Sequence, residues 1–227
     1  MDIDELRRRL EARLKAVSVP EICSEGTLKS NNDEEVPYEV AMGWDLQAAI
    51  ECDELWRVFN LELLAYIQEN FCDEELDKVF ATLSLEDFNW EWQKKSVLLK
   101  TDEYVWFFLK AEGVPQAACL IHHPKGSQID QSDIFYIEFI AVAPWNRDNP
   151  YKKRRFRGLG RILVDVALDH SVNALGLVHG FSLHSLPKAE PFYKALGMQP
   201  FPAADKDKLA YYEMPRETAR GLLEASL

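Results

Sequence analysis

The residues with the clearest chemical potential form a basic, glycine-containing loop, Arg155-Phe156-Arg157-Gly158-Leu159-Gly160. The loop follows an apolar segment, Ile134 to Ala143, and leads into an amphipathic segment, Gly158 to Leu175. Glycines at a strand-to-helix turn let backbone N–H groups close around an anion at the positive end of the helix. The sequence therefore predicts an anion site where this helix begins.

The charge around this loop is concentrated. Between Trp145 and Arg161 there is a single anion, Asp148, and there are seven cations, namely Arg147, Lys152, Lys153, Arg154, Arg155, Arg157 and Arg161. The whole chain carries a formal charge of −12, with 26 Lys and Arg against 38 Asp and Glu. A local basic patch on an acidic protein points to an anionic ligand at that place.

Three phosphate-binding patterns can be compared with the loop. No GxxxxGK[ST] string occurs in the chain, so a P-loop is excluded. The dinucleotide pattern GxGxxG fails because Leu163 stands where its third glycine should be. The pattern that fits is [QR]xxGx[GA], read from Arg155 to Gly160.

With this pattern the sequence resembles the GNAT superfamily of acetyl-CoA-dependent N-acyltransferases. The preceding Ile140-Ala141-Val142-Ala143-Pro144 is similar to the family's hydrophobic-x-Val-x-Pro segment. A second motif, from Ala189 to Met198, looks like the family's A-x-x-[FL]-Y-x-x-x-G-[FM] helix. The resemblance extends over roughly residues 104–214, and the first hundred residues match it only loosely.

The resemblance implies acetyl-CoA as the acyl donor and assigns roles to residues. The loop would bind the pyrophosphate, and the preceding strand would bind the pantetheine arm through its backbone. The expected cofactor-binding residues are Ile140, Ala141, Val142, Arg155, Phe156, Arg157, Gly158, Leu159, Gly160, Arg161 and Phe192. Lys152, Lys153 and Arg154 either contact the 3′-phosphate or face solvent.

The resemblance also implies catalytic roles. Tyr193 corresponds to the general acid that protonates the departing thiolate. Glu138 is the candidate base, because it is the only carboxylate within the apolar strand Ile134 to Ala143, and Tyr136 shares its face by alternation. The competing interpretations are Tyr193 as a packed core aromatic, and Glu138 as a carboxylate that is paired with a neighbouring cation or lies at a strand irregularity.

Two departures from the family pattern stand out. Residues 145–154 form an insertion between the Val-x-Pro turn and the glycines, which would fold over the cofactor or face a partner. Leu186 stands where the family commonly has Asn, seven positions before Tyr193, so Ser185 or His184 would have to replace that group. Together with His122 and His123, His184 lacks Cys or carboxylate partners at ligand spacing, and no metal site is predicted.

The periodicity predicts the elements that position these residues. Residues 38–96 are mostly helical in pattern, whereas the second half alternates strands and helices. Strands are expected at 104–110, 116–122, 134–143, 177–183 and 209–214, and helices at 158–175 and 187–196. The predicted fold class is mixed α/β, with a GNAT-like domain and an enlarged N-terminal helical region.

The first 37 residues are expected to stand apart from the domain. Residues 2–17 have an amphipathic helical pattern, and residues 18–37 are polar with two prolines, which indicates a linker. The predicted division is therefore 1–37 for the helix and linker and 38–227 for the GNAT-like domain. Such a helix would pack on its own domain, on a second copy as a homodimer, or on a partner.

Composition and cysteine spacing indicate the compartment and the partners that we expect for the protein. The four cysteines form no CxxC motif, the N-terminus lacks a secretory h-region, and no stretch of about 18 apolar residues occurs. These features predict a cytoplasmic protein without a membrane segment. The acidic balance argues against a nucleic-acid partner and favours a cationic acceptor such as a polyamine, an aminoglycoside-like molecule or a lysine side chain.

The sequence thus predicts an N-acetyltransferase that moves an acetyl group from acetyl-CoA to a primary amine by direct attack in a ternary complex. Two alternatives stay open. One is an acetylating toxin that acts on aminoacyl-tRNA, with the basic insertion binding RNA. The other is a GNAT-shaped sensor module that binds acyl-CoA without turnover.

Overall fold

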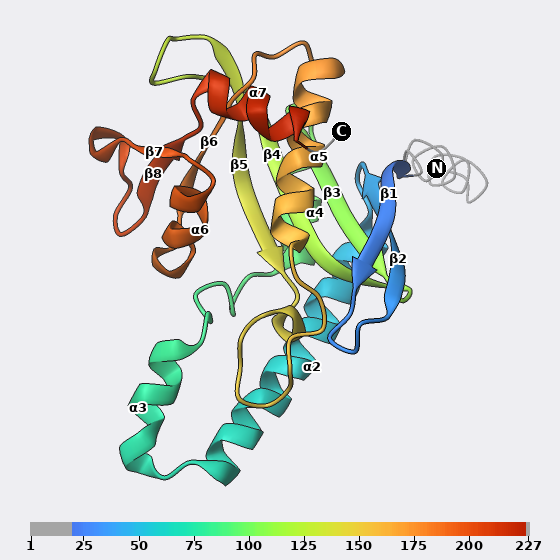
Figure 1. The fold of residues 1–227 in the computed structure, drawn as a ribbon, viewed down its shortest axis with the longest axis vertical. Coiled ribbons are helices and arrows are strands. Elements are labelled where there is room, and N and C mark those ends of the chain that lie inside the picture. Colours follow the sequence, from blue (N-terminus) through green and yellow to red (C-terminus); the bar gives the residue numbers. More distant parts are fainter. Residues whose placement is uncertain (1–19, 226–227) are drawn as a thin grey trace, which may run out of the picture.

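The computed structural model describes residues 20–225, so the helix expected at residues 2–17 lies outside the described part of the chain. One eight-stranded sheet has the strand order β1-β2-β3-β4-β5-β6-β8-β7 (Figure 1). Its strands are β1 (Glu21–Lys29), β2 (Glu35–Met42), β3 (Tyr104–Ala111), β4 (Val114–Gly126), β5 (Asp133–Val142), β6 (Phe181–Ser185), β7 (Gln199–Pro200) and β8 (Ala210–Glu213). All neighbouring pairs are antiparallel except β5 and β6, which are parallel.

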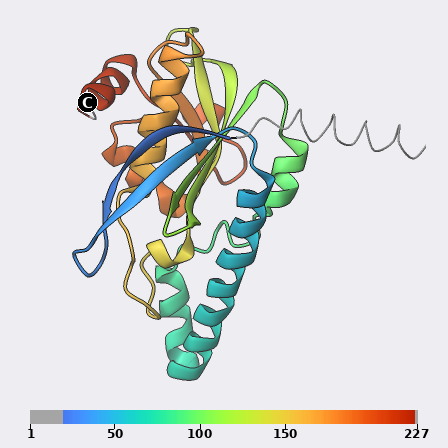
Figure 2. The ribbon, with the colours of Figure 1, turned by 90° about the vertical axis from the view of Figure 1, so that its right-hand side faces the viewer.

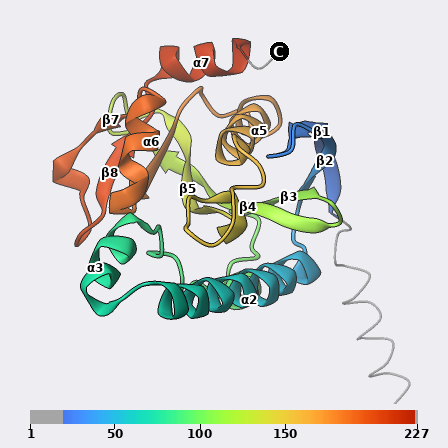
Figure 3. The same ribbon diagram turned by 60° about the horizontal axis from the view of Figure 1, so that its bottom comes forward.

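Helices cover both faces of the sheet. They are α2 (Leu46–Asn70), α3 (Asp73–Thr82), α4 (Trp92–Leu98), α5 (Leu159–Asn173), α6 (Glu190–Ala195) and α7 (Arg216–Glu224). Figure 3 shows the sheet between α2 on one side and α5 and α7 on the other, and Figure 2 shows α2 and α3 reaching beyond the sheet. The predicted mixed α/β class is confirmed.

The central strands are apolar without interruption because each face of the sheet has its own core. In β3, Phe107 and Leu109 pack in the cluster that includes α5, whereas Trp106 and Phe108 pack in the cluster that includes α2. All four side chains are at most 1% exposed. A strand buried on both faces loses the polar alternation of a one-sided strand.

The linker expected at residues 18–37 is wrong from residue 21 onward. These residues form β1 and the beginning of β2, a hairpin whose second strand pairs with β3 through Tyr38 and Ala111. The polar run after Ser30 is the hairpin turn, in which the Ser30 hydroxyl accepts the N–H groups of Asn32 and Glu34. The expected boundary at residue 37 therefore falls inside a strand that belongs to the sheet.

The hairpin was missed because it lies at the edge of the sheet. Most side chains of β1 and β2 are exposed or only partly buried, so their sequence is polar like that of a loop. Leu28 and Val40, at 4% and 0% exposure, are the apolar contacts that attach it to the core. The predicted helical segment at 38–96 correspondingly starts later, at Leu46.

Strand β5 changes its pairing in the middle, and this positions the site. On one side it is bulged, since Ile121 pairs with Ile137 and Leu120 pairs with Phe139, which leaves Glu138 as the extra residue. On the other side it pairs with β6 only from Phe135 to Ile137. Beyond Ile137 the two parallel strands separate, and residues 138–142 have no partner on β6.

The first turn of α2 is tied to the sheet by Asp45. Its Oδ1 accepts the N–H of Ala48 at 2.9 Å as the helix cap, and its Oδ2 lies 3.0 Å from the ammonium of Lys110 on β3. Both side chains are largely buried, at 14% and 23% exposure.

We expect Asp45→Ala to lower the free energy of unfolding by about 1–2 kcal/mol, because a helix cap and a shielded ion pair are lost together. Urea denaturation measures the change. Arg220→Ala removes an ion pair with Glu217 that is 47% and 77% exposed, and it should cost less than about 0.5 kcal/mol. Equal effects of the two substitutions would contradict this account.

Candidate functional site

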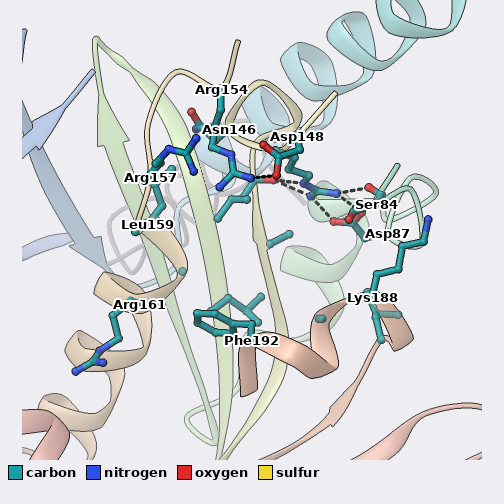
Figure 4. Close-up of a pocket in the computed structure, with 18 of the residues that line it drawn as sticks. Ser84, Asp87, Asn146, Asp148, Arg154, Arg157, Leu159, Arg161, Lys188 and Phe192 are labelled. Carbon is teal, nitrogen blue, oxygen red and sulfur yellow. Dashed lines mark hydrogen bonds and ion pairs between the residues drawn. The ribbon is translucent and has the colours of Figure 1, made fainter. Parts of the chain in front are cut away.

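A cavity of about 430 Å³ opens where β5 and β6 separate. Its walls come from the end of β5, the loop into α5, the beginning of α6, and the connection after α3 (Figure 4). Segments far apart in the sequence thus meet at one opening of the sheet.

The N-terminus of α5 faces this cavity. Gly158 is the N-cap residue, with φ of +81°, and among residues 20–225 no side-chain cap hydrogen bond is formed at this end of the helix. The first intrahelical bond runs from the N–H of Ile162 to the Gly158 carbonyl. The N–H groups of Leu159, Gly160 and Arg161 have no carbonyl one turn back, so the anion site predicted from the glycines lies on the cavity wall.

Most of the expected cofactor-binding residues come together here. The cavity is lined by Ile140, Ala141, Val142, Phe156, Arg157, Gly158, Leu159, Gly160, Arg161, Phe192 and Tyr193. Residues 140–142 border the cavity in the part of β5 that has no partner on β6. Phe192, which is 37% exposed, lies opposite the start of α5 in Figure 4.

Arg155 is the exception, and its expected contact with phosphate needs correction. It does not line the cavity; its guanidinium pairs with Glu112 in the β3–β4 turn. Its backbone is held on both sides, since its N–H bonds the Trp145 carbonyl and its own carbonyl accepts the N–H of Asn31. The side chain therefore points toward the hairpin turns, away from the helix end.

Other cations of the basic loop differ in where they lie. Arg154 and Arg157 line the cavity, and Figure 4 shows both above the start of α5. Arg161 also lines it, but its Nε lies 2.7 Å from Asp165, one turn further along the helix. Lys152 pairs with Glu62 on α2 at 3.7 Å and stays outside. Arg154 and Arg157 are thus the cations placed for an anion at this helix end, although Arg154 also pairs with Asp148.

The insertion at 145–154 is anchored by a buried amide. The Oε1 of Gln116, whose side chain is 1% exposed, accepts the indole N–H of Trp145 at 2.7 Å and the amide N–H of Asn146 at 2.9 Å. Asn146 in turn accepts the N–H of Phe156 at 3.0 Å. The insertion packs against α2, where the Tyr151 ring contacts Phe59. It forms a wall of the site.

Arg147 joins the end of β5 to the helical front end. Its guanidinium donates to the Val142 carbonyl from Nε at 2.9 Å and from Nη2 at 2.6 Å, and it forms two contacts with the Asp87 carboxylate. A further bond reaches the Ser84 carbonyl at 2.9 Å. Neither Arg147 nor Asp87 was assigned a site role from sequence, because only the fold brings the 84–87 segment beside β5. The Val142 carbonyl already accepts hydrogen bonds from Arg147, so a ligand at the end of β5 would bond to other backbone groups of this strand.

Tyr193 lies on the cavity wall and in the core at once. Its side chain is 5% exposed and packs in the cluster that contains α5 residues. Burial raises the pKa of its phenol far above the usual range, and the nearby Cys119 adds to the shift. The phenol of Tyr193 is therefore protonated near neutral pH.

Glu138 is not among the residues that line this cavity. Its charge acts on Lys95 of α4 and on Tyr104, so Glu138 lies on the α4 face of β5. Burial, followed by the charge of Glu138, raises the pKa of Tyr136 to about 12. The effect of the Glu138 charge on Tyr136 agrees with the prediction that the two side chains share one face of β5. The two expected catalytic residues differ, because Tyr193 lines the cavity described above and Glu138 does not.

Within residues 20–225, no group of three or more His, Cys, Asp or Glu side chains is arranged to hold a metal ion. In the same part of the chain, no helix has the length and apolar character needed to cross a membrane.

No family model and no curated protein matches the chain. Among solved structures, it is similar to RimJ of Mycobacterium smegmatis in complex with CoA-disulfide, at 12% identity and a TM-score of 0.48, over 90% of this chain and 95% of that one. It is also similar to apo FdhC, a nucleotide-linked sugar GNAT (11% identity, TM-score 0.46, 88% and 96% covered). A third is the GNAT domain of S. lividans PAT (11% identity, TM-score 0.46, 84% and 96% covered).

We expect the Tyr193 phenol to remain un-ionised beyond the usual tyrosine pKa of about 10. An alkaline titration followed by tyrosinate absorbance should give the same curve for the wild type and Tyr193→Phe until the protein unfolds. In urea the two curves should differ by one tyrosine that titrates near the usual value. A difference that develops in the folded proteins near pH 10 would show that the phenol is not shielded as described.

Proposed function

We propose that this protein is an N-acetyltransferase that transfers an acetyl group from acetyl-CoA to a primary amine. The observation that carries the proposal is the uncapped N-terminus of α5, with Gly158 at positive φ, beside the part of β5 that β6 leaves unpaired. Amide N–H groups at a helix start bind phosphate oxygens, and an unpaired strand edge binds an extended amide chain. CoA combines a pyrophosphate with such an amide-containing arm.

The residues present fit this donor. The amides of Leu159 and Gly160 would hold the pyrophosphate, with Arg154 and Arg157 supplying charge beside it. The backbone of residues 140–142 would orient the pantetheine arm toward α6. Phe192 adds an apolar surface beside the arm.

Tyr193 is suited to deliver a proton to the departing thiolate. Burial keeps the phenol protonated but also makes it a weaker acid than a free tyrosine, so the proton transfer requires that the same apolar surroundings raise the basicity of the departing thiolate. Glu138, on the α4 side of β5, is suited to receive the acceptor amine and to take a proton from it. Donor and acceptor would then approach the end of β5 from opposite faces, and the amine would attack the thioester directly.

The acidic balance of the chain, −12, supports a cationic acceptor through long-range attraction. The RNA-binding alternative gains no support from Lys152 of the insertion, which pairs with Glu62 on α2. A sensor module without turnover is the alternative that an assay separates. Binding of labelled acetyl-CoA without its consumption, over a broad amine panel and several pH values, would favour the sensor.

Gly158→Asp should weaken acetyl-CoA binding by at least roughly 100-fold, or about 2.7 kcal/mol. The substitution places a carboxylate against the phosphates at a backbone angle that favours glycine. Isothermal titration calorimetry gives the affinity. Gly176→Asp is the matched control, because Gly176 also has positive φ and open space around it but follows the other end of α5. Similar affinities of the two variants would argue against a phosphate site at Gly158.

Tyr193→Phe should lower kcat by about 100-fold, the usual range for loss of a general acid, and leave acetyl-CoA affinity nearly unchanged. Initial rates and calorimetry separate the two quantities. Tyr212→Phe is the control, since Tyr212 is also buried and loses a hydrogen bond to Glu190 but does not line the cavity. A Tyr193→Phe enzyme with wild-type kcat would show that the acid is another group.

A further inference from the structure

His184 is held in one tautomer by two short hydrogen bonds. Its Nε2 lies 2.8 Å from the Ala204 carbonyl, and its Nδ1 lies 2.7 Å from the hydroxyl of Tyr136. A carbonyl oxygen only accepts, so Nε2 carries the hydrogen. In the neutral ring Nδ1 is then the acceptor, and the Tyr136 hydroxyl donates to it. The Tyr136 oxygen consequently keeps lone-pair capacity for another donor.

This pair lies where the acceptor amine is expected. Tyr136 comes two residues before the Glu138 bulge, and Glu138 adds to the rise of the Tyr136 pKa, so the two groups are close. The β5–β6 pairing ends with the pair Ile137 and Leu183, so Tyr136 belongs to it and His184 follows its last residue on β6. The tyrosine hydroxyl is thus fixed beside the point where the strands begin to separate.

Proton accounting calls for a second acceptor in this place. An alkyl ammonium loses one proton before its nitrogen attacks the thioester and a second after the C–N bond has formed. Tyr193 supplies a proton to the sulfur on the other face and takes none from the nitrogen. Glu138 accounts for one of the two protons lost, and the other needs a separate path.

The geometry points to His184 as the acceptor of the second proton, through Tyr136; this inference rests on the proposed transferase function. As the nitrogen gives its proton to the Tyr136 oxygen, the hydroxyl passes its own proton to Nδ1 of His184. The C–N bond has formed, the C–S bond breaks, and the thiolate receives the Tyr193 proton. The resulting imidazolium donates to Tyr136 and to Ala204. Glu138 and His184 later each release a proton, Tyr193 takes one back, and one proton in total goes to solvent.

The groups that contact His184 come from three segments. Tyr136 belongs to β5, the Ala204 carbonyl to the segment between β7 and β8, and Tyr211 on β8 lies with its ring centre 5.1 Å from that of His184. The Tyr211 hydroxyl donates to the buried Glu213 at 3.1 Å. On the loop behind Ala204, Asp205 accepts the Tyr211 N–H at 2.8 Å. Of these groups, Tyr136 is the one that hydrogen-bonds Nδ1 of His184. A proton therefore reaches the imidazole through the Tyr136 hydroxyl.

Steady-state kinetics tests the relay. The wild type is first assayed with acetyl-CoA and each of three amines, namely spermidine, kanamycin A and Nα-acetyl-lysine, and the amine that it acetylates fastest is then used for the variants. His184→Gln and Tyr136→Phe should each lower kcat by about 10- to 100-fold, with acetyl-CoA affinity by calorimetry unchanged. The double variant should be no slower than either single variant, because both remove one path. The dependence of kcat on pH should change in His184→Gln, because glutamine cannot accept the second proton.

His122→Gln is the matched control. His122 lies on the neighbouring strand β4, paired in register with Tyr136, but its ring packs against Tyr104 at 5.1 Å. Its kcat and pH profile should equal those of the wild type within about two-fold.

The tautomer is tested separately by long-range proton–nitrogen NMR of histidine-labelled protein. At neutral pH His184 should show a protonated Nε2 and an unprotonated Nδ1. A protonated Nδ1 in the neutral ring would overturn the relay, since that atom could then accept nothing.

Failure of the relay and failure of the proposed function give different results. A wild-type protein that consumes acetyl-CoA, together with His184→Gln and Tyr136→Phe variants of unchanged kcat and pH profile, would overturn the relay and leave the proposed function intact. A wild-type protein that neither binds nor consumes acetyl-CoA would overturn both.

Discussion

The separation of β5 from β6 is the constraint on which the rest of the site depends. Three residues of parallel pairing, from Phe135 to Ile137, hold the strands together, and the bulge at Glu138 then shifts the alternation of β5. Ile137 and Ile140 consequently face the α5 cluster, whereas Phe139 faces the α2 cluster. Backbone groups that a continuous sheet would consume are left for a ligand, and α5 begins beside them.

The basic insertion serves this opening mainly through a few fixed contacts. Gln116 holds its beginning, and Arg147 connects the Val142 carbonyl to Asp87 in the front end. Five of the seven cations between Trp145 and Arg161 form ion pairs with carboxylates, which divides the basic patch of the sequence among separate contacts. What faces the helix end is a smaller positive site centred on Arg154 and Arg157.

The two faces of β5 carry different chemistry. The α5 face holds the cavity and Tyr193, a phenol kept neutral by burial. The α4 face holds Glu138 and the Tyr136–His184 pair, whose hydrogen bonds define a tautomer. A sheet is one strand thick, so groups on opposite faces can act on one bond only where the strand edge is open. In this protein that place is the end of β5.

Local signals in the sequence predict most strands and helices of the second half and the glycine turn at Gly158, because glycines, periodicity and charge depend on neighbouring residues alone. It misassigned residues 21–37 because an edge hairpin exposes most of its side chains and is therefore as polar as a linker. Only the tertiary structure decided where Arg155 points, that Arg147 meets Asp87, and that His184 bonds Tyr136. These contacts join residues that lie 43 to 60 positions apart in the chain. No local sequence pattern encodes which distant partner a side chain will meet.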